Sequence, residues 1–241
     1  MTPLIVTDFG LSKLPLAEYV SLIAAATNAF NGALLARRPD HYKHFTLIGV
    51  IALAFAGGIG GGIARDVLLD RIPKPLVNPW YIIVCLCAAS IALAIDYGSG
   101  QRFKDGLFQF MTAFTLPWYA VVGAQAALGA HLGYLAAVLI GVIATSAGRW
   151  IIDIACNVVP KQLVRGEFFI SAAALTAIVY TGAVTIGGID AVPATGIAVV
   201  AGFSFRILAL RRGWEEWEPW EPQALREGER ARKTLMESIR G

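Results

Sequence analysis

The chain has 241 residues, of which 56% are hydrophobic and only 15% are charged, with a net charge of +3. A soluble domain has about a quarter of its residues charged, whereas 15 of the 37 charges here lie from Arg206 onward. The 205 residues before Arg206 therefore carry too few charges to cover a soluble globule. The small net charge argues against a nucleic-acid partner, and the composition indicates an integral membrane protein.

Seven segments are long and apolar enough to cross a bilayer, which requires roughly 20 mostly apolar residues. They cover residues 16–36, 46–69, 79–96, 107–128, 132–158, 167–187 and 191–210. Lys and Arg in the short connections number ten on one side of these spans and three on the other. Because basic loops stay in the cytoplasm, the N-terminus is predicted outside and the C-terminus inside, in a multi-pass protein of the inner membrane.

An internal repeat emerges when the second span is aligned with the fifth at an offset of 87 residues. Gly61 then falls on Gly148 and Asp66 on Asp153, and Pro73-Lys74 falls on Pro160-Lys161. A four-residue gap in the preceding loop also brings Gly32 onto Gly123. Each copy has three spans, an odd number, so the second copy must lie inverted in the membrane, as in many transporters and some channels.

We therefore predict an all-α integral membrane protein of seven transmembrane helices, built from two inverted three-helix repeats and a seventh helix. The first repeat, with a short N-terminal segment, occupies residues 1–105, and the second occupies 106–189. The seventh helix covers 190–213, and a charged cytoplasmic tail follows at 214–241. In the tail, charges of alternating sign at helical spacing are typical of a solvated helix.

The second span contains five glycines within the six residues 57–62, among them Gly60, Gly61 and Gly62. Each costs roughly 1 kcal/mol relative to Ala inside a helix, and backbone groups freed within lipid must be satisfied by protein or by cavity water. We expect the second and fifth spans to be kinked or broken and to line a wet pathway. Close helix packing through small residues is the alternative.

Charged residues lie about one turn beyond the glycines. Arg65 and Asp66 follow them in the second span, and Arg149 and Asp153 occupy the corresponding part of the fifth. A charge at membrane depth costs on the order of 2.5–3.5 kcal/mol, so these side chains must pair or line a water-filled cavity. The i, i+4 spacing lets Arg149 pair with Asp153, and pairs across the repeats, from Arg65 to Asp153 or from Asp66 to Arg149, are alternatives. A polar throat and a purely structural cluster both remain open.

Polar residues also interrupt the first and fourth spans. Asn28 and Asn31 lie in the first span, Thr112 and Thr115 lie in the fourth, and Pro117 is expected to kink the fourth. They either line the same pathway or form interhelical hydrogen bonds. No nucleophile–base pair or metal-ligand spacing occurs, and the three cysteines are typical of buried apolar positions. The sequence thus predicts neither an enzyme nor a cofactor.

Four motifs carry a resemblance to a known family. They are Gly32-Ala-Leu-Leu-Ala-Arg-Arg, Gly60-Gly-Gly-Ile-Ala-Arg-Asp-Val-Leu-Leu, Arg71-Ile-Pro and Arg206-Ile-Leu-Ala-Leu-Arg-Arg-Gly-Trp. Over residues 16–214 the chain resembles the bacterial membrane family with a duplicated glycine transporter domain, which is similar to the trimeric intracellular cation channels. The resemblance implies a homotrimer with one pathway for monovalent cations, above all potassium, in each protomer.

The chain departs from that family at two positions. Ala147-Gly148-Arg149 stands where a second glycine triplet would be, and Ile152 takes the place that corresponds to Arg65. Three functions are considered: a potassium-permeable channel, a secondary transporter of a small amino acid such as glycine, and a scaffold whose tail recruits a cytoplasmic partner. A half-helix N-terminus that holds a carboxylate serves the transporter equally well.

Overall fold

The computed structural model describes residues 16–36, 45–94, 101–160, 162–164, 168–214 and 216. Helices make up nearly all of this part of the chain, and no strand occurs in it. They are α1 (Leu16–Ala36), α2 (Leu47–Leu68), α3 (Lys74–Val77), α4 (Trp80–Ala94), α5 (Gln101–Leu128), α6 (Tyr134–Ala155), α7 (Phe169–Thr185) and α8 (Ala191–Arg212). The N-terminal segment, several of the loop residues counted for orientation, and the tail beyond Glu216 lie outside the described residues.

Four helices in the described ranges are long and apolar enough to cross a membrane: α1 from Glu18, α2, α6 and α8. The helices α4 and α7 are apolar but shorter, with 15 and 17 residues. The helix α5 has 28 residues and contains Pro117. The chain is therefore a multi-pass membrane protein that is all-helical over the described residues, and each of the seven predicted spans overlaps one helix of at least 15 residues.

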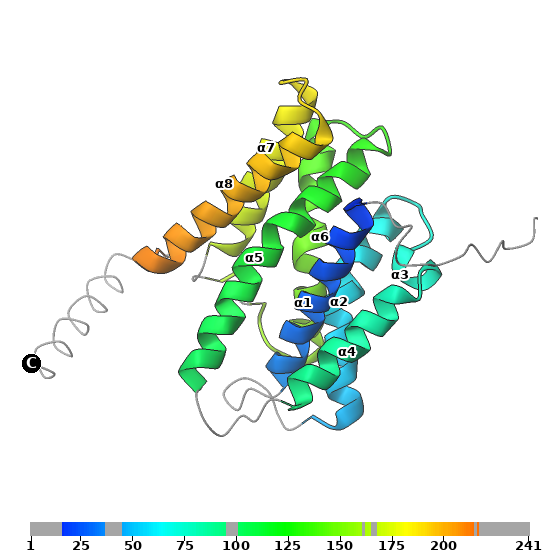
Figure 1. Cartoon of the computed structure of the whole chain (residues 1–241), viewed down its shortest axis with the longest axis vertical. Helices are drawn as coiled ribbons and strands as arrows, with labels where there is room; N and C mark the ends of the chain where they lie inside the picture. The colour runs from blue at the N-terminus through cyan, green and yellow to red at the C-terminus, as the bar shows by residue number, and fades with distance from the viewer. Residues whose placement is uncertain are drawn as a thin grey trace, which may run out of the picture.

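The helices form two bundles that are joined side by side. In the first, α1 packs against α2 and α4; in the second, α5, α6 and α7 pack against one another, and α8 covers α5 and α7. Figure 1 shows α1, α2 and α4 on one side of the molecule, α7 and α8 on the other, and α5 and α6 between them. Contacts of α2 with α6 and of α1 with α5 join the bundles.

Equivalent helix ends reveal the repeat in three dimensions. The helix α2 is followed by Asp70 at a φ of 51°, and α6 is followed 87 residues later by Asn157 at a φ of 56°. The hydrogen bonds of the two ends also match, since Arg71 N donates to Asp66 O at 2.9 Å and Val158 N donates to Asp153 O at 2.8 Å. The left-handed residue that ends each helix is the same structural device used twice.

Equivalent glycines lie where the two helices of each pair approach most closely. A Cβ on Gly32 of α1 would overlap the carbonyl of Leu53, and a Cβ on Gly123 of α5 would lie 2.9 Å from the carbonyl oxygen of Ile140. Leu53 and Ile140 are themselves 87 residues apart. The pair α1–α2 and the pair α5–α6 thus cross at corresponding points, with a glycine allowing backbone contact each time.

Candidate functional site

The two copies meet where α2 crosses α6. A Cβ on Gly61 would overlap the carbonyl of Ala144, and a Cβ on Gly148 would lie 3.1 Å from the carbonyl oxygen of Gly57. Since Gly57 corresponds to Ala144 and Gly61 to Gly148, the contact is reciprocal, as a two-fold axis requires. The residue numbers of the contacts rise along α2 while they fall along α6, so the two helices are antiparallel.

The glycines serve this crossing, and the helix is not broken at them. The helices α2 and α6 run without interruption from Leu47 to Leu68 and from Tyr134 to Ala155, so the expectation of a broken helix is wrong, while the expected kinks stay a prediction. Gly60 and Gly61 pack against the backbone of α6 near Gly148, as the small-residue alternative predicted. Gly62 differs, because the nearest atom to a Cβ there is Pro75 Cγ at 3.9 Å. Close packing offsets the poor helix propensity of glycine.

The antiparallel crossing separates the charged pairs. With Gly61 opposite Ala144 and Gly57 opposite Gly148, Asp153 lies level with residue 52 of α2, fourteen residues from Asp66. At 1.5 Å per residue the two carboxylates are about 20 Å apart along the axis. The predicted pairs between the repeats are therefore wrong, and each copy forms its own pair. We call the two ends of the crossing the Asp66 end and the Asp153 end.

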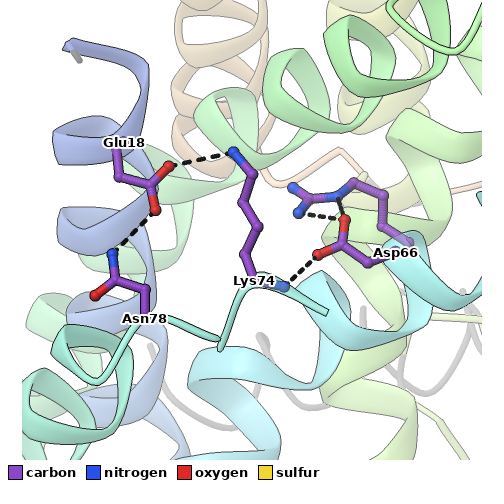
Figure 2. A network of polar contacts seen from close by, with 5 residues as sticks. Glu18, Asp66, Lys74 and Asn78 are labelled. Carbon is purple, nitrogen blue, oxygen red and sulfur yellow. Dashed lines mark hydrogen bonds and ion pairs between the residues drawn. The ribbon is translucent and has the colours of Figure 1, made fainter. Parts of the chain in front are cut away.

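At the Asp66 end the pair continues into a longer polar network (Figure 2). Arg65 Nε donates to Asp66 Oδ1 at 2.7 Å, and Asp66 Oδ2 accepts from the backbone N of Lys74 at 2.9 Å. Glu18 accepts from both Lys74 Nζ and Asn78 Nδ2 at 3.2 Å. Arg65 and Asp66 are almost fully buried, whereas the Lys74 side chain is 57% exposed. The network ties α1 and α2 to the segment that contains α3.

A small cavity of about 10 Å³, which holds about one water molecule and is partly open to solvent, lies beside this network. Residues from α1, α2, α3, α4 and α5 form its wall: Ser21, Ala24, Gly58, Ile59, Gly62, Arg65, Pro75, Tyr81, Tyr119 and Val122. The Tyr119 hydroxyl donates to the carbonyl oxygen of Gly58 at 2.6 Å. The wall combines apolar groups with two phenol rings, and the one arginine in it is paired with Asp66.

At the Asp153 end Arg149 Nε donates to Asp153 Oδ1 at 2.9 Å, which confirms the predicted i, i+4 pair. Asp153 is fully buried, and the Arg149 side chain is 19% exposed. Asp66 and Asp153 are equivalent, but their arginines are not. Arg149 occupies the position of Gly62, and Ile152 occupies that of Arg65. Each buried carboxylate thus keeps a cation on its own helix, from a different position in each repeat.

Between the two ends, α1 and α5 exchange hydrogen bonds. The Thr115 hydroxyl lies 3.2 Å from Asn28 Oδ1 and donates to Met111 O at 2.9 Å. Asn31 Nδ2 donates to Thr112 Oγ1 at 3.2 Å. Asn28 and Thr115 are therefore in contact, as the predicted pathway requires, although interhelical bonding was the alternative. The interhelical hydrogen bonds are therefore observed, and the place of these residues on a pathway stays a prediction.

Several residues of this region were not predicted. Glu18 and Asn78 enter the Asp66-end network, and Tyr81 and Tyr119 enter the cavity wall. A signal existed for Glu18, since it is an acid at the start of an apolar span and needs a cation nearby. Nothing in the hydropathy pattern distinguishes Tyr119 from the other aromatic residues of the spans.

These features define a helical membrane protein with an internal duplication, two buried ion pairs and a cavity between its helices. Comparison with known proteins gives the same result. The family described as glycine transporter matches twice, over residues 18–97 and 109–185, which are the two copies. The chain belongs to this family.

Relatives of known structure share the fold. A TRIC trimeric intracellular cation channel orthologue from Rhodobacter sphaeroides is 27% identical, with a TM-score of 0.70 over 82% of this chain and 98% of that protein. Another TRIC cation channel has a TM-score of 0.74 at 24% identity, over 86% of this chain and 99% of that one.

A relative is also found by sequence. The inner membrane protein YadS of Escherichia coli K12 is 25% identical over 197 residues, which cover 81% of this chain and 92% of YadS.

Proposed function

We propose that the protein is a homotrimeric channel for monovalent cations, permeable to potassium, with one pathway inside each protomer. The observation that carries this proposal is the cavity at the Asp66 end, which reaches the glycine-rich face of α2 at Gly58 and Gly62. Membership of the family and the fold shared with TRIC cation channels support it. The pathway runs from this cavity, past the polar side chains between α1 and α5, to the Asp153 end.

We also propose the membrane arrangement that this pathway requires. All seven long helices cross the inner membrane, and the repeats 1–105 and 106–189 are inverted with respect to each other. The antiparallel, reciprocal contact of α2 with α6 supports the inversion. The helix at 190–213 completes the protomer, and the tail 214–241 is cytoplasmic. With the N-terminus outside, the Asp66 end faces the exterior and the Asp153 end faces the cytoplasm.

Two arginines near a cation pathway are compatible with cation flux because both are paired. Arg65 lies 2.6 Å from Asp66, and Arg149 lies 2.9 Å from Asp153. A paired guanidinium contributes little net charge to the path, and a change of partner would make it a gate. We propose that α2 and α6 bend at Gly60, Gly61 and Gly148 when the channel opens, since glycine tolerates the required change in backbone angles.

The test is single-channel recording of the purified protein in a planar bilayer with asymmetric KCl. Discrete openings that reverse towards the potassium potential are expected. Gly62→Leu places a side chain in the open space of the cavity and is expected to reduce the conductance strongly. Gly196→Leu is the matched control, because a Cβ on that exposed glycine of α8 meets no atom within 4 Å. A wild-type protein that shows no openings contradicts the proposal.

A secondary transporter of a small amino acid such as glycine is the second candidate. The description of the family favours it, and Arg65 in the cavity wall is the group that would hold a substrate carboxylate. Arg65 already binds Asp66 through both Nε and Nη2, which leaves it less able to accept a second carboxylate. Saturable glycine uptake into liposomes, with no channel openings in the bilayer, would establish the transporter.

A further inference from the structure

The internal repeat relates the wall of the Asp66-end cavity to a second set of residues. The first and fourth spans correspond at an offset of 91 residues, which is the separation of Gly32 from Gly123. Four cavity residues therefore have equivalents on the other helix of the α1–α5 pair: Ser21 corresponds to Thr112, Ala24 to Thr115, Tyr119 to Asn28 and Val122 to Asn31. The equivalents are the same four residues that join α1 to α5.

The second set of residues is more polar than the first. Where the Asp66-end cavity has a hydroxyl, a methyl, a phenol and an isopropyl group, the equivalent set has two hydroxyls and two carboxamides. Asn28 and Asn31 are three residues apart on α1, and Thr112 and Thr115 are three apart on α5, so each pair lies on one helix face. Two cross-helix contacts of 3.2 Å bring the four side chains together.

Their oxygens are only partly used by the protein. Asn31 is buried, and its Oδ1 has no hydrogen-bond partner within the described part of the chain. The single hydroxyl proton of Thr115 is shared between Met111 O at 2.9 Å and Asn28 Oδ1 at 3.2 Å. When that proton turns to Met111, Asn28 Oδ1 and the lone pairs of the Thr115 hydroxyl are both available to a ligand. A buried acceptor without a donor is costly, and a cation removes that cost.

The cluster lies where the proposed pathway is farthest from water on both sides. A Cβ on Gly57 would lie 2.7 Å from the carbonyl oxygen of Asn28, so α1 touches the glycine run of α2 there. Residue 59 is the centre of the reciprocal α2–α6 contact, which puts Asn28 within about 3 Å of the level of the pseudo-two-fold axis. An ion at that depth is farthest from water on both sides, and it needs protein oxygens to replace its hydration shell.

We propose that Asn28, Asn31, Thr112 and Thr115 form a binding site for a partly dehydrated monovalent cation at the midpoint of the protomer. Its place on the pathway rests on the proposed channel function. The four side chains supply neutral oxygens, and none of them is a carboxylate. Calcium and magnesium sites rely on carboxylates or retain several waters. The site therefore selects monovalent over divalent cations by its ligand type.

The first test measures conductance against KCl concentration. Loss of one polar ligand changes an affinity by about tenfold, so Asn31→Leu is expected to raise the half-saturating concentration about tenfold, and Thr112→Val by several-fold. Asn31→Asp, which adds a charge and keeps the oxygens, is expected to lower it and to admit divalent cations. Thr195→Val is the matched control, since the Thr195 hydroxyl bonds only to Ala191 O of its own helix α8.

The second test measures binding without flux. The thermal unfolding midpoint of the full chain in detergent is followed with KCl and with choline chloride at equal ionic strength. A potassium-specific increase that is lost in Asn31→Leu supports the site, because a ligand bound by the native state alone stabilises it. This measurement can also be made if the bilayer recordings show no openings. In that case the channel function is refuted, and the unfolding data alone decide whether the site exists.

Two results would overturn the inference. One is a conducting wild type in which Asn31→Leu, Asn31→Asp and Thr112→Val all keep the concentration dependence of Thr195→Val; the channel then stands and the four residues are interhelical hydrogen bonds only. The other is a midpoint with no preference for potassium over choline, together with a silent bilayer, which refutes both the site and the channel. Should Asn31→Leu fail to fold, Asn31→Asp and Thr112→Val decide the outcome.

Discussion

Neighbouring glycines of α2 should respond in opposite directions to the same substitution. In Gly61→Ala the new Cβ falls on the carbonyl of Ala144, with the carbonyl carbon at 3.2 Å. The helices α2 and α6 must separate by about 0.3–0.8 Å to restore an ordinary contact of 3.5–4.0 Å with that carbon, and by more to clear the carbonyl oxygen. Overpacking of this kind typically costs about 1–3 kcal/mol, and the obstacle is backbone, which has no rotamer to change. The gain in helix propensity is only about 1 kcal/mol.

In Gly62→Ala the Cβ meets Pro75 Cγ at 3.9 Å, an ordinary contact. The propensity gain then stands alone, and we expect stabilisation by up to about 1 kcal/mol. Chemical or thermal unfolding of both variants in the same detergent gives the comparison, with trimer content followed by size-exclusion chromatography. If the two variants shift stability in the same direction, or if Gly61→Ala is the more stable, the packing described for the α2–α6 crossing is incorrect.

Three further predictions concern the ion pairs. Arg65→Met leaves the buried Asp66 carboxylate without its cation and is expected to lower the free energy of unfolding by about 3–5 kcal/mol. The double variant Arg65→Met/Asp66→Asn should recover much of that loss. Additive losses from the two substitutions would contradict the pairing. Arg149→Met should be similarly costly, because Asp153 is fully buried, and a loss under 1 kcal/mol would mean that another group neutralises Asp153. Glu18→Gln should lower the free energy of unfolding by less than about 1 kcal/mol, since the Lys74 side chain that it pairs with is 57% exposed. A loss of several kcal/mol in the same unfolding assay would show that this contact stabilises the fold more than its exposure indicates.

Hydropathy predicted which segments form helices better than it predicted where each helix begins. The predicted span 107–128 corresponds to α5, which starts six residues earlier at Gln101, because a helix continues through polar residues beyond the apolar run. The four-residue helix α3 was not predicted at all. It lies in the connection after α2, with Pro75 in its first turn, and a single turn has no periodicity that a sequence pattern can detect.

The repeat was readable from the sequence because both copies kept the same residue types at their turning points. Asp66 and Asp153, with the left-handed residues Asp70 and Asn157 after them, end equivalent helices. What the sequence could not provide was the direction in which each glycine faces. Five glycines in six residues cover more than half of the circumference of α2, so the separation of Gly61 at the crossing from Gly62 at the cavity depends on how α6 is placed.

The two halves of the proposed pathway are related by symmetry and differ in chemistry, which determines what a cation would meet in each half. At the Asp66 end the wall is mainly apolar and aromatic, and Arg65 belongs to it. At the equivalent positions of the other half the side chains are carboxamides and hydroxyls, and the arginine has moved to the position of Gly62. A perfectly symmetric protomer would present the same barrier twice. In the proposed site, the neutral oxygens near the axis give an ion a single polar step between the two buried Arg–Asp pairs. Substitutions at Asn31 and at Gly62 should therefore affect different properties: the first the concentration at which conductance saturates, the second its maximum.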